Sequence, residues 1–265
     1  MLTMGVDAGS AATKAVVIDT DKNIILGYDI RSTGADVEEA ARVVAEVALS
    51  KAGLSMQDLD YILSTGWGRK GVPFANSGKS EIMCHATGAY HLIPETRTVI
   101  DIGGQDSKAI SLTDMGIVAD FVMNDKCAAG TGRFLETLAG ILEVTLEDIG
   151  NLATRSKNPA NISSTCVVFA ETEVVALRSK KIPLEDIVAG VVKSMITRVA
   201  TMASQINLRK EIVFTGGTAK NPGLVKYLER ELGVKLYMPE EPQIIGALGA
   251  ALLAKDEAYR AASSN

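Results

Sequence analysis

One pattern occurs twice in this sequence and constrains the fold more than any other feature. A buried strand ends at an aspartate, a turn of small residues follows, and a second strand returns. The first copy is centred on Asp7-Ala8-Gly9-Ser10 and the second on Asp101-Ile102-Gly103-Gly104, each between apolar runs typical of a β-hairpin. The repetition predicts an α/β protein of two related half-domains, over residues 1–94 and 95–265. We expect them to share a cleft, with the C-terminal helix packing back on the first.

The two turns have the composition of phosphate-binding loops. Their small side chains allow backbone N–H groups to approach a phosphate, and Lys14 can supply the countercharge. Asp7 is a candidate to hold Mg²⁺ through water. In the second copy, Gln105 is a candidate to position an attacking water, while Asp101 and Asp106 can act through Mg²⁺ or as a base. An ordinary hairpin with a small-residue loop is the alternative for either turn taken alone.

Two cysteines stand ahead of predicted helices. Cys127 precedes a glycine-rich turn and a helical pattern, and Cys166 follows the hydroxyl residues of Ser163-Ser164-Thr165 and opens an amphipathic run. A helix N-terminus favours the thiolate, which ligates metals, whereas a small buried hydrophobe is the alternative for each cysteine alone. Two thiolates cannot complete a four-ligand metal or iron–sulfur site. The missing pair could come from an identical subunit across a two-fold axis.

Other polar motifs are less specific. Cys84 and His85 are neighbours on a predicted helix, cannot face one another, and are expected to be buried structural residues. The lone Trp67 either contacts a partner or nucleotide, or packs. A buried strand ends at Thr215-Gly216-Gly217, and a helix starts near Pro222. That glycine turn suits a backbone lying against a planar base or sugar.

Composition excludes several functional classes. The 265 residues are 47% hydrophobic with a net charge of −5, so we expect no nucleic-acid surface. No apolar run reaches membrane-spanning length and no signal-peptide pattern is present, so no membrane association is expected. Three cysteines, an odd number, argue against a disulfide framework. These observations predict a cytoplasmic protein.

Taken together, the motifs resemble a known group of ATP-binding proteins. The Asp7 and Asp101 hairpins and the Thr215-Gly-Gly turn resemble the two phosphate motifs and the adenosine motif of the acetate and sugar kinase/Hsp70/actin superfamily. With the Cys127 and Cys166 motifs, nearly all of residues 1–255 resembles one branch. That branch is the activator ATPases of 2-hydroxyacyl-CoA dehydratases, related to the ATPase subunits of benzoyl-CoA reductase. The fold that this implies is two actin-like (ribonuclease H-like) half-domains with a nucleotide cleft between them.

The resemblance also implies an activity. It implies a homodimer with one [4Fe-4S] cluster held by Cys127 and Cys166 of each subunit, ATP or ADP with Mg²⁺ in the cleft, and ferredoxin or flavodoxin as electron donor. Hydrolysis would drive one electron into a partner iron–sulfur enzyme, either a dehydratase or a related reductase such as the double-cubane-cluster type. The nucleotide contacts that it implies are Ser10, Ala11, Ala12, Thr13, Lys14, Gly103, Gly104, Gln105, Asp106, Gly216, Gly217 and Gln243.

Two alternatives share this fold. A small-molecule kinase needs a substrate pocket and a base, but no paired cysteines ahead of helices. A nucleotide-switched scaffold would bind ATP without hydrolysing it or transferring phosphate or electrons. Replacement of Cys127 and Cys166 by Ala separates the first alternative from an electron-transfer activator, because a kinase would keep its turnover. The relatives of the chain often carry Tyr where it has Trp67, and its 71–80 loop is less typical, which leaves the acceptor enzyme open.

Overall fold

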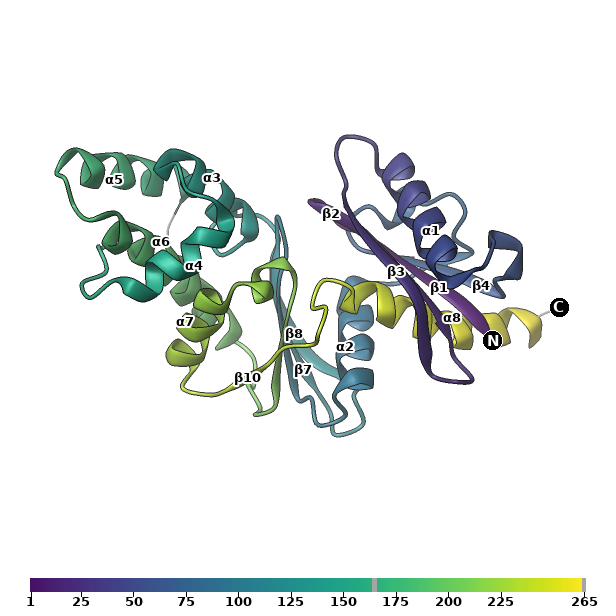
Figure 1. Ribbon diagram of the computed structural model, residues 1–265. Coiled ribbons are helices and arrows are strands. Elements are labelled where there is room, and N and C mark those ends of the chain that lie inside the picture. Colours follow the sequence, from purple (N-terminus) through teal and green to yellow (C-terminus); the bar gives the residue numbers. More distant parts are fainter. Residues whose placement is uncertain (164–165, 264–265) are drawn as a thin grey trace. The chain divides into compact units, whose positions relative to one another are not determined.

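The computed structural model describes residues 1–163 and 166–263, and it divides into two compact units (Figure 1). Unit 1 comprises Met1–Val99, Leu112–Ala119 and Pro239–Asn265, and unit 2 comprises Ile100–Ser111 and Asp120–Met238. Both contain a sheet covered by helices, so the predicted α/β class is confirmed. Two residues of the predicted Ser163–Thr165 cap, Ser164 and Thr165, lie outside the described residues.

The first sheet has the strand order β3-β2-β1-β4-β5. β1 pairs with β2 and β2 with β3 in antiparallel fashion, while β1–β4 and β4–β5 are parallel. In the first hairpin Asp7 lies opposite Lys14. The strand bounds are β1 (Leu2–Ala8), β2 (Ala12–Asp19), β3 (Ile24–Ser32), β4 (Tyr61–Thr65) and β5 (Ser77–Gly78).

Two helices, α1 (Val37–Ala52) and α8 (Ile245–Ser263), cover the first sheet, and α2 (Glu81–Leu92) packs against α8. Alternate residues of β2 enter different cores, since Val17 packs with α1 residues and Val16 with α8 residues. Burial on both faces explains why these strands are continuous apolar runs. A Cβ atom on Gly249 of α8 would overlap the carbonyl group of Cys84, so glycine here permits α8 to lie close against α2.

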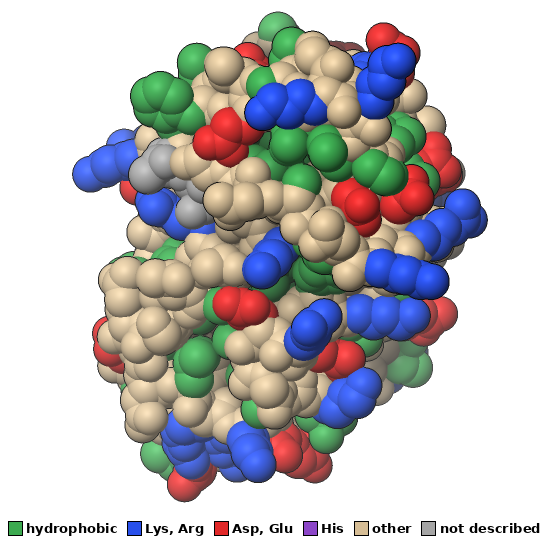
Figure 2. Space-filling view, turned by 90° about the vertical axis from the view of Figure 1, so that its left-hand side faces the viewer, with side chains coloured by type: hydrophobic (Ala, Val, Ile, Leu, Met, Phe, Trp, Pro, Cys, Tyr) green, Lys and Arg blue, Asp and Glu red, His purple; other side chains and the backbone are tan. Residues whose placement is uncertain are grey.

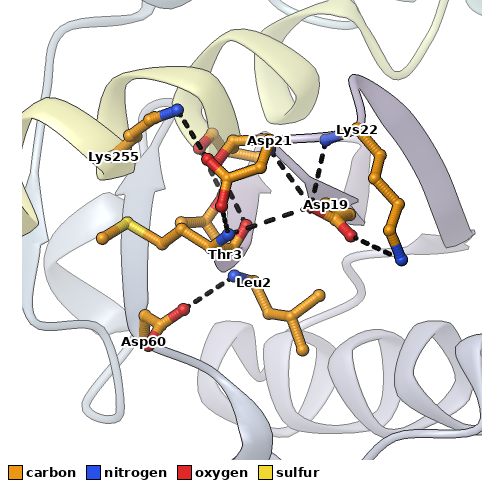
Figure 3. Close-up of polar contacts among 10 residues, drawn as sticks. Leu2, Thr3, Asp19, Asp21, Lys22, Asp60 and Lys255 are labelled. Carbon is orange, nitrogen blue, oxygen red and sulfur yellow. Dashed lines mark hydrogen bonds and ion pairs between the residues drawn. The ribbon is translucent and has the colours of Figure 1, made fainter.

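Polar contacts at the start of β1 join the β2–β3 turn to α8 (Figure 3). Asp21 accepts hydrogen bonds from the N-terminal ammonium and, at 2.9 Å, from Lys255 Nζ. The hydrogen bond from the N-terminal ammonium, and next that from Lys255, lowers the pKa of Asp21 to about 2. On the other side of β1, the Leu2 N–H donates to Asp60 Oδ2 at 2.7 Å. This network ties the last helix to the first hairpin of unit 1.

The second sheet repeats the plan of the first. Its order is β10-β9-β6-β7-β8, so each strand has a counterpart: β6 for β1, β7 for β2, β8 for β3, β9 for β4 and β10 for β5. β8 was not predicted as a strand; its first residues are largely exposed, and it forms an edge of the sheet. The strand bounds are β6 (Thr98–Ile102), β7 (Ser107–Leu112), β8 (Val118–Asn124), β9 (Ile212–Thr215) and β10 (Leu236–Tyr237).

The helices of unit 2 surround α6, which is buried along most of its length. α3 and α5 lie side by side (Figure 1), and Arg178 Nη1 at the end of α5 donates to the Ile141 carbonyl of α3 at 2.6 Å. The sequence did not predict α4, which begins at a capping box formed by Thr145 and Asp148. The helix bounds are α3 (Gly132–Leu142), α4 (Leu146–Arg155), α5 (Val167–Ser179), α6 (Leu184–Ala203) and α7 (Pro222–Leu232). Within the described part of the chain, none of the helices has the length and apolar character needed to span a membrane.

Candidate functional site: two aspartate hairpins and a pair of cysteines

The first hairpin places an ion pair at the end of β1. Asp7 is buried, and its Oδ2 atom lies 3.0 Å from Lys14 Nζ, which belongs to the facing position of β2. The side chain of Lys14 is 15% exposed. An ammonium with one carboxylate partner and partial solvent access has donors left for a further anion. The predicted countercharge is therefore available beside this turn.

The turn between β1 and β2 combines accessible and fixed residues. Ala11 is exposed, Ser10 and Ala12 are half-buried, and Thr13 is buried. The Thr13 hydroxyl lies 2.9 Å from the Thr33 hydroxyl, which donates to the Gly9 carbonyl at 2.6 Å. Thr33 thus braces the turn from β3, and the small side chains at 10–12 leave the backbone of the turn accessible.

Glycines allow two further segments of unit 1 to approach Asp7. Gly66, at the end of β4, has a φ of +86°, and a Cβ atom there would overlap Asp7 Oδ1. A Cβ atom on Gly246 would lie 3.1 Å from Asp7 Oδ2 and 3.0 Å from His85 Nε2. His85 and Cys84 are buried, as predicted, and burial raises the pKa of the Cys84 thiol to about 12. Cys84 is therefore a thiol at neutral pH and unsuited to bind a metal.

Trp67 projects from the same segment. The residue is 74% exposed, and the neighbouring Gly68 N–H donates to the Ala8 carbonyl at 2.8 Å. The packing alternative for this tryptophan is wrong, because most of its surface faces solvent. Within the 71–80 loop, Asn76 bonds to β4, with its Oδ1 accepting from the Ile62 N–H at 2.7 Å.

The second hairpin holds a buried lysine between two carboxylates. Lys108 Nζ lies 3.1 Å from Asp101 Oδ2 and 2.8 Å from Asp106 Oδ1, and only 2% of its side chain is exposed. The other oxygen of Asp101 accepts a hydrogen bond from the Thr215 hydroxyl at 2.8 Å. Sequence reasoning missed Lys108 and Thr215 as members of this group. A signal was available, because the spacing of Asp101 and Lys108 repeats that of Asp7 and Lys14.

The turn of the second hairpin is bonded to the start of α3. The Gly132 and Arg133 N–H groups donate to the Gly103 and Gly104 carbonyls, both at 2.8 Å. Across the turn, the Gly103 N–H donates to the Asp106 carbonyl at 2.9 Å. Gln105 is exposed at the tip, whereas Gly103, Gly104 and Asp106 are half-buried.

The remaining predicted nucleotide contacts belong to both units. Gly216 follows β9 in unit 2 with a φ of +88°, and a Cβ atom there would overlap the Ile102 carbonyl oxygen. This contact repeats the approach of Gly66 to the first hairpin. Gly217 is exposed beside it. Gln243 belongs to unit 1, where its N–H donates to Glu241 Oε1 at 3.1 Å.

Both candidate metal ligands lie in unit 2, but only one of them begins a helix. Cys166 opens α5, as predicted, and is itself the N-cap residue, a position that the sequence assigned to the hydroxyl residues before it. Cys127 lies in the loop after β8, and α3 starts later, at Gly132 with Thr131 as N-cap. The predicted helix N-terminus at Cys127 is wrong, because Thr131 closes a separate turn by donating from its N–H and its hydroxyl to the Ala128 carbonyl.

The Cys127 loop is fixed by Asn124. Its Nδ2 atom donates to the Cys127 and Ala129 carbonyls, both at 2.9 Å. Cys127 and Cys166 are free and half-buried. Within residues 1–163 and 166–263, no group of three or more His, Cys, Asp and Glu side chains could hold a metal ion. The described part of one chain therefore holds no complete four-ligand site around either thiol.

Apolar side chains are exposed close to Cys166. Val168, Phe169 and Val175 of α5 are exposed, and only Ala170 and Val174 of this helix are buried. Figure 2 looks onto the side of unit 2 where α3 and α5 lie, and it shows hydrophobic patches among acidic and basic side chains. No single sign of charge dominates this face.

Comparison with known proteins identifies the group to which the chain belongs. Residues 4–254 match the family model for the BadF/BadG/BcrA/BcrD ATPase family. The chain is 44% identical to the 2-hydroxyisocaproyl-CoA dehydratase activator of Clostridioides difficile, over 97% of this chain and 96% of that protein. It is 42% identical to the (R)-2-hydroxyglutaryl-CoA dehydratase activating ATPase of Acidaminococcus fermentans, over 97% and 98% of the two chains.

Solved structures agree with these matches. The activator of the 2-hydroxyisocaproyl-CoA dehydratase from Clostridium difficile with bound ADPNP has a TM-score of 0.92 at 42% identity, covering 100% of this chain and 98% of that chain. A ROK family glucokinase from Streptomyces griseus has a TM-score of 0.59 at 14% identity, over 97% and 100% of the two chains, and shares the fold alone. The expected two-lobed fold of the actin and sugar kinase superfamily is confirmed. The chain belongs to the BadF/BadG/BcrA/BcrD ATPase family.

Proposed function

We propose that this protein is an ATP-dependent electron-transfer activator. In this proposal it forms a homodimer in which Cys127 and Cys166 of both subunits hold one [4Fe-4S] cluster. ATP is hydrolysed to ADP and phosphate with Mg²⁺, one electron leaves a reduced ferredoxin or flavodoxin, and one electron reaches a partner iron–sulfur enzyme. That partner is a 2-hydroxyacyl-CoA dehydratase or a related reductase, including the double-cubane-cluster type. The names of the two relatives reported above, both dehydratase activators, support this role.

One observation carries the coupling of hydrolysis to electron transfer. The Gly103-Gly104 turn, a proposed phosphate site, accepts two backbone hydrogen bonds from Gly132 and Arg133, and the Cys127 loop immediately precedes these residues. If loss of the γ-phosphate moves this turn, the hydrogen bonds to Gly132 and Arg133 would move the start of α3. The loop that carries Cys127 would then move as well. Order changes of this kind at a phosphate-binding turn are a common route for nucleotide switching.

The available side chains suit the proposed cofactors. Two half-buried thiols on segments joined through the packed helices α3 and α5 provide half of a four-thiolate site, so a second copy would complete it. A cluster bound there would store and release one electron. The carboxylates of Asp7, Asp101 and Asp106 are oxygen ligands of the kind that Mg²⁺ prefers, either directly or through water. Gln105, exposed at the tip of the second turn, is proposed to orient the attacking water. The backbones of Ser10–Lys14, Gly103–Asp106, Gly216, Gly217 and Gln243 are proposed to contact ATP.

The proposal is tested by following hydrolysis and electron transfer in the same preparation. The anaerobic protein is reduced, mixed with MgATP and an acceptor iron–sulfur enzyme, and assayed for phosphate release and for one-electron reduction of the acceptor. We expect Cys127→Ala and Cys166→Ala to hydrolyse ATP without reducing the acceptor. The control Cys84→Ala, which removes the buried thiol of unit 1, should keep both activities. Transfer by either ligand variant at the wild-type rate would refute the proposal. So would transfer of the γ-phosphate to a small alcohol with no electron transfer.

A further inference from the structure

Two lysines occupy equivalent positions but have different surroundings. Lys14 and Lys108 each lie on the second strand of a hairpin, seven residues after the aspartate that they contact. Lys14 has one carboxylate partner and is 15% exposed, whereas Lys108 has two and is 2% exposed. We propose that Lys108 is a positioning residue for ATP hydrolysis that fixes the Asp106 carboxylate, while Lys14 is the lysine that meets the nucleotide phosphates. The inference rests on the phosphate site proposed above.

Burial prevents Lys108 from acting as a phosphate ligand. An ammonium taken out of water costs several kcal/mol unless it is paired and hydrogen-bonded. Here Asp101 and Asp106 supply that pairing at 3.1 and 2.8 Å. A movement of Lys108 towards a phosphate would leave two carboxylates facing each other without a cation between them. Lys14 has no such constraint, because it contacts a single carboxylate from a partly exposed position.

Asp106 is the group that this arrangement positions. Asp101 is 4% exposed and is also held by Thr215, whereas the Asp106 side chain is 21% exposed and adjoins Gln105 at the tip of the turn. A Cβ atom on Gly103 would overlap Asp106 Oδ1, so glycine leaves room for this carboxylate to lie against the turn. With Lys108 on one side and Gly103 on the other, Asp106 is fixed while part of its side chain stays accessible. A fixed carboxylate next to the candidate water-positioning residue can hold a metal-bound or attacking water in one place.

Steady-state ATP hydrolysis by the full-length protein distinguishes the two lysines. In Lys108→Met the Asp106 carboxylate is no longer held in place, so kcat should fall on the order of 100-fold, the cost that a misplacement of about 1 Å can produce. KM for ATP should stay nearly unchanged. Lys14→Met should instead raise KM, because it removes a contact to the bound phosphates. Lys226→Met, a control on the exposed surface of α7, should leave both constants at the wild-type value. A rise in KM with unchanged kcat for Lys108→Met would overturn the proposal.

A double variant tests whether Lys108 acts through Asp106. The same variant tests the proposal if Lys108→Met alone does not fold. If Lys108 acts only by fixing Asp106, Lys108→Met combined with Asp106→Asn should have the kcat of Asp106→Asn alone. The combined variant also removes one charge of each sign, and mant-ADP binding verifies that it is folded. A further fall in kcat beyond the Asp106→Asn value would contradict a role through Asp106. Because Cys127→Ala and Cys166→Ala are expected to keep ATP hydrolysis, this result is read separately from iron content and electron transfer, which test the proposed function.

Discussion

The hairpins around Asp7 and Asp101 have the same plan but are held by different neighbours. Both carry an aspartate paired with a lysine on the facing strand, and both are approached by a positive-φ glycine after the adjacent strand, Gly66 or Gly216. The first turn is braced by Thr33 from the next strand of its own sheet. The second is bonded instead to the start of α3, next to the Cys127 loop. The comparison indicates that the two proposed phosphate-binding turns share one plan, and that the second is hydrogen-bonded to the residues that follow the Cys127 loop.

The largest expected difference between the hairpins concerns their lysines. Lys108→Met takes the cation away from the buried Asp101 carboxylate and the half-buried Asp106 carboxylate, and it should lower the free energy of unfolding by about 3–5 kcal/mol. Lys14→Met removes one hydrogen-bonded ion pair with partial exposure and should cost about 1–2 kcal/mol. Chemical denaturation of both variants measures the difference. Equal losses would show that the two lysines have equivalent structural roles after all.

Substitution of the glycines that approach the hairpins should give the next largest loss in the free energy of unfolding. This loss should be similar in the two units. Gly66→Ala and Gly216→Ala each combine a left-handed backbone with overlap against a backbone carbonyl, and each should cost about 2–3 kcal/mol. Gly34 and Gly233 also have positive φ, but nothing lies within 4 Å of a Cβ atom there. Gly34→Ala and Gly233→Ala should therefore cost only about 1 kcal/mol. Thermal or denaturant unfolding of the four variants measures whether Gly66→Ala and Gly216→Ala lose more stability than Gly34→Ala and Gly233→Ala.

A smaller effect is expected where β8 meets the Cys127 loop. Asn124→Ala removes two hydrogen bonds to the Cys127 and Ala129 carbonyls and should lower the free energy of unfolding by about 1–2 kcal/mol. Because the loop is no longer held, iron bound after anaerobic reconstitution should fall as well. Asn151→Ala on the exposed surface of α4 is the matched control. Full iron content in Asn124→Ala would show that the loop does not need this brace.

The smallest effect belongs to the Asp21 network at the other end of the first hairpin. The pKa of Asp21 is about 2 in the folded protein, below the value of about 4 expected in the unfolded chain. The carboxylate therefore stabilises the fold above pH 4, and this contribution is lost as the pH falls towards 2. Asp21→Asn should unfold more easily than the wild type at pH 7, and the two proteins should converge near pH 2. A constant difference across that range would rule out this linkage.

The sequence was sufficient where local chemistry and topology agree. Both hairpins, the helix that starts at Pro222, and the buried Cys84 and His85 follow from residue patterns. The edge strand β8 was missed because exposed residues interrupt its apolar pattern. Cys127 was expected at a helix N-terminus, but the Ala128–Thr131 turn, closed by hydrogen bonds from Thr131 to the Ala128 carbonyl, separates it from the start of α3. Lysine is rarely buried, so only the repeated aspartate–lysine spacing could have pointed to Lys108.

Iron and sulfide content, with an EPR spectrum of protein purified without oxygen, tests the central claim most directly. We expect about four irons per dimer and a reducible signal, because four thiolates hold one cubane. Both should be lost in Cys127→Ala and in Cys166→Ala, and both should be kept in Cys84→Ala. Absence of iron from the wild type after anaerobic purification and attempted reconstitution would contradict a cluster shared between two copies of this chain.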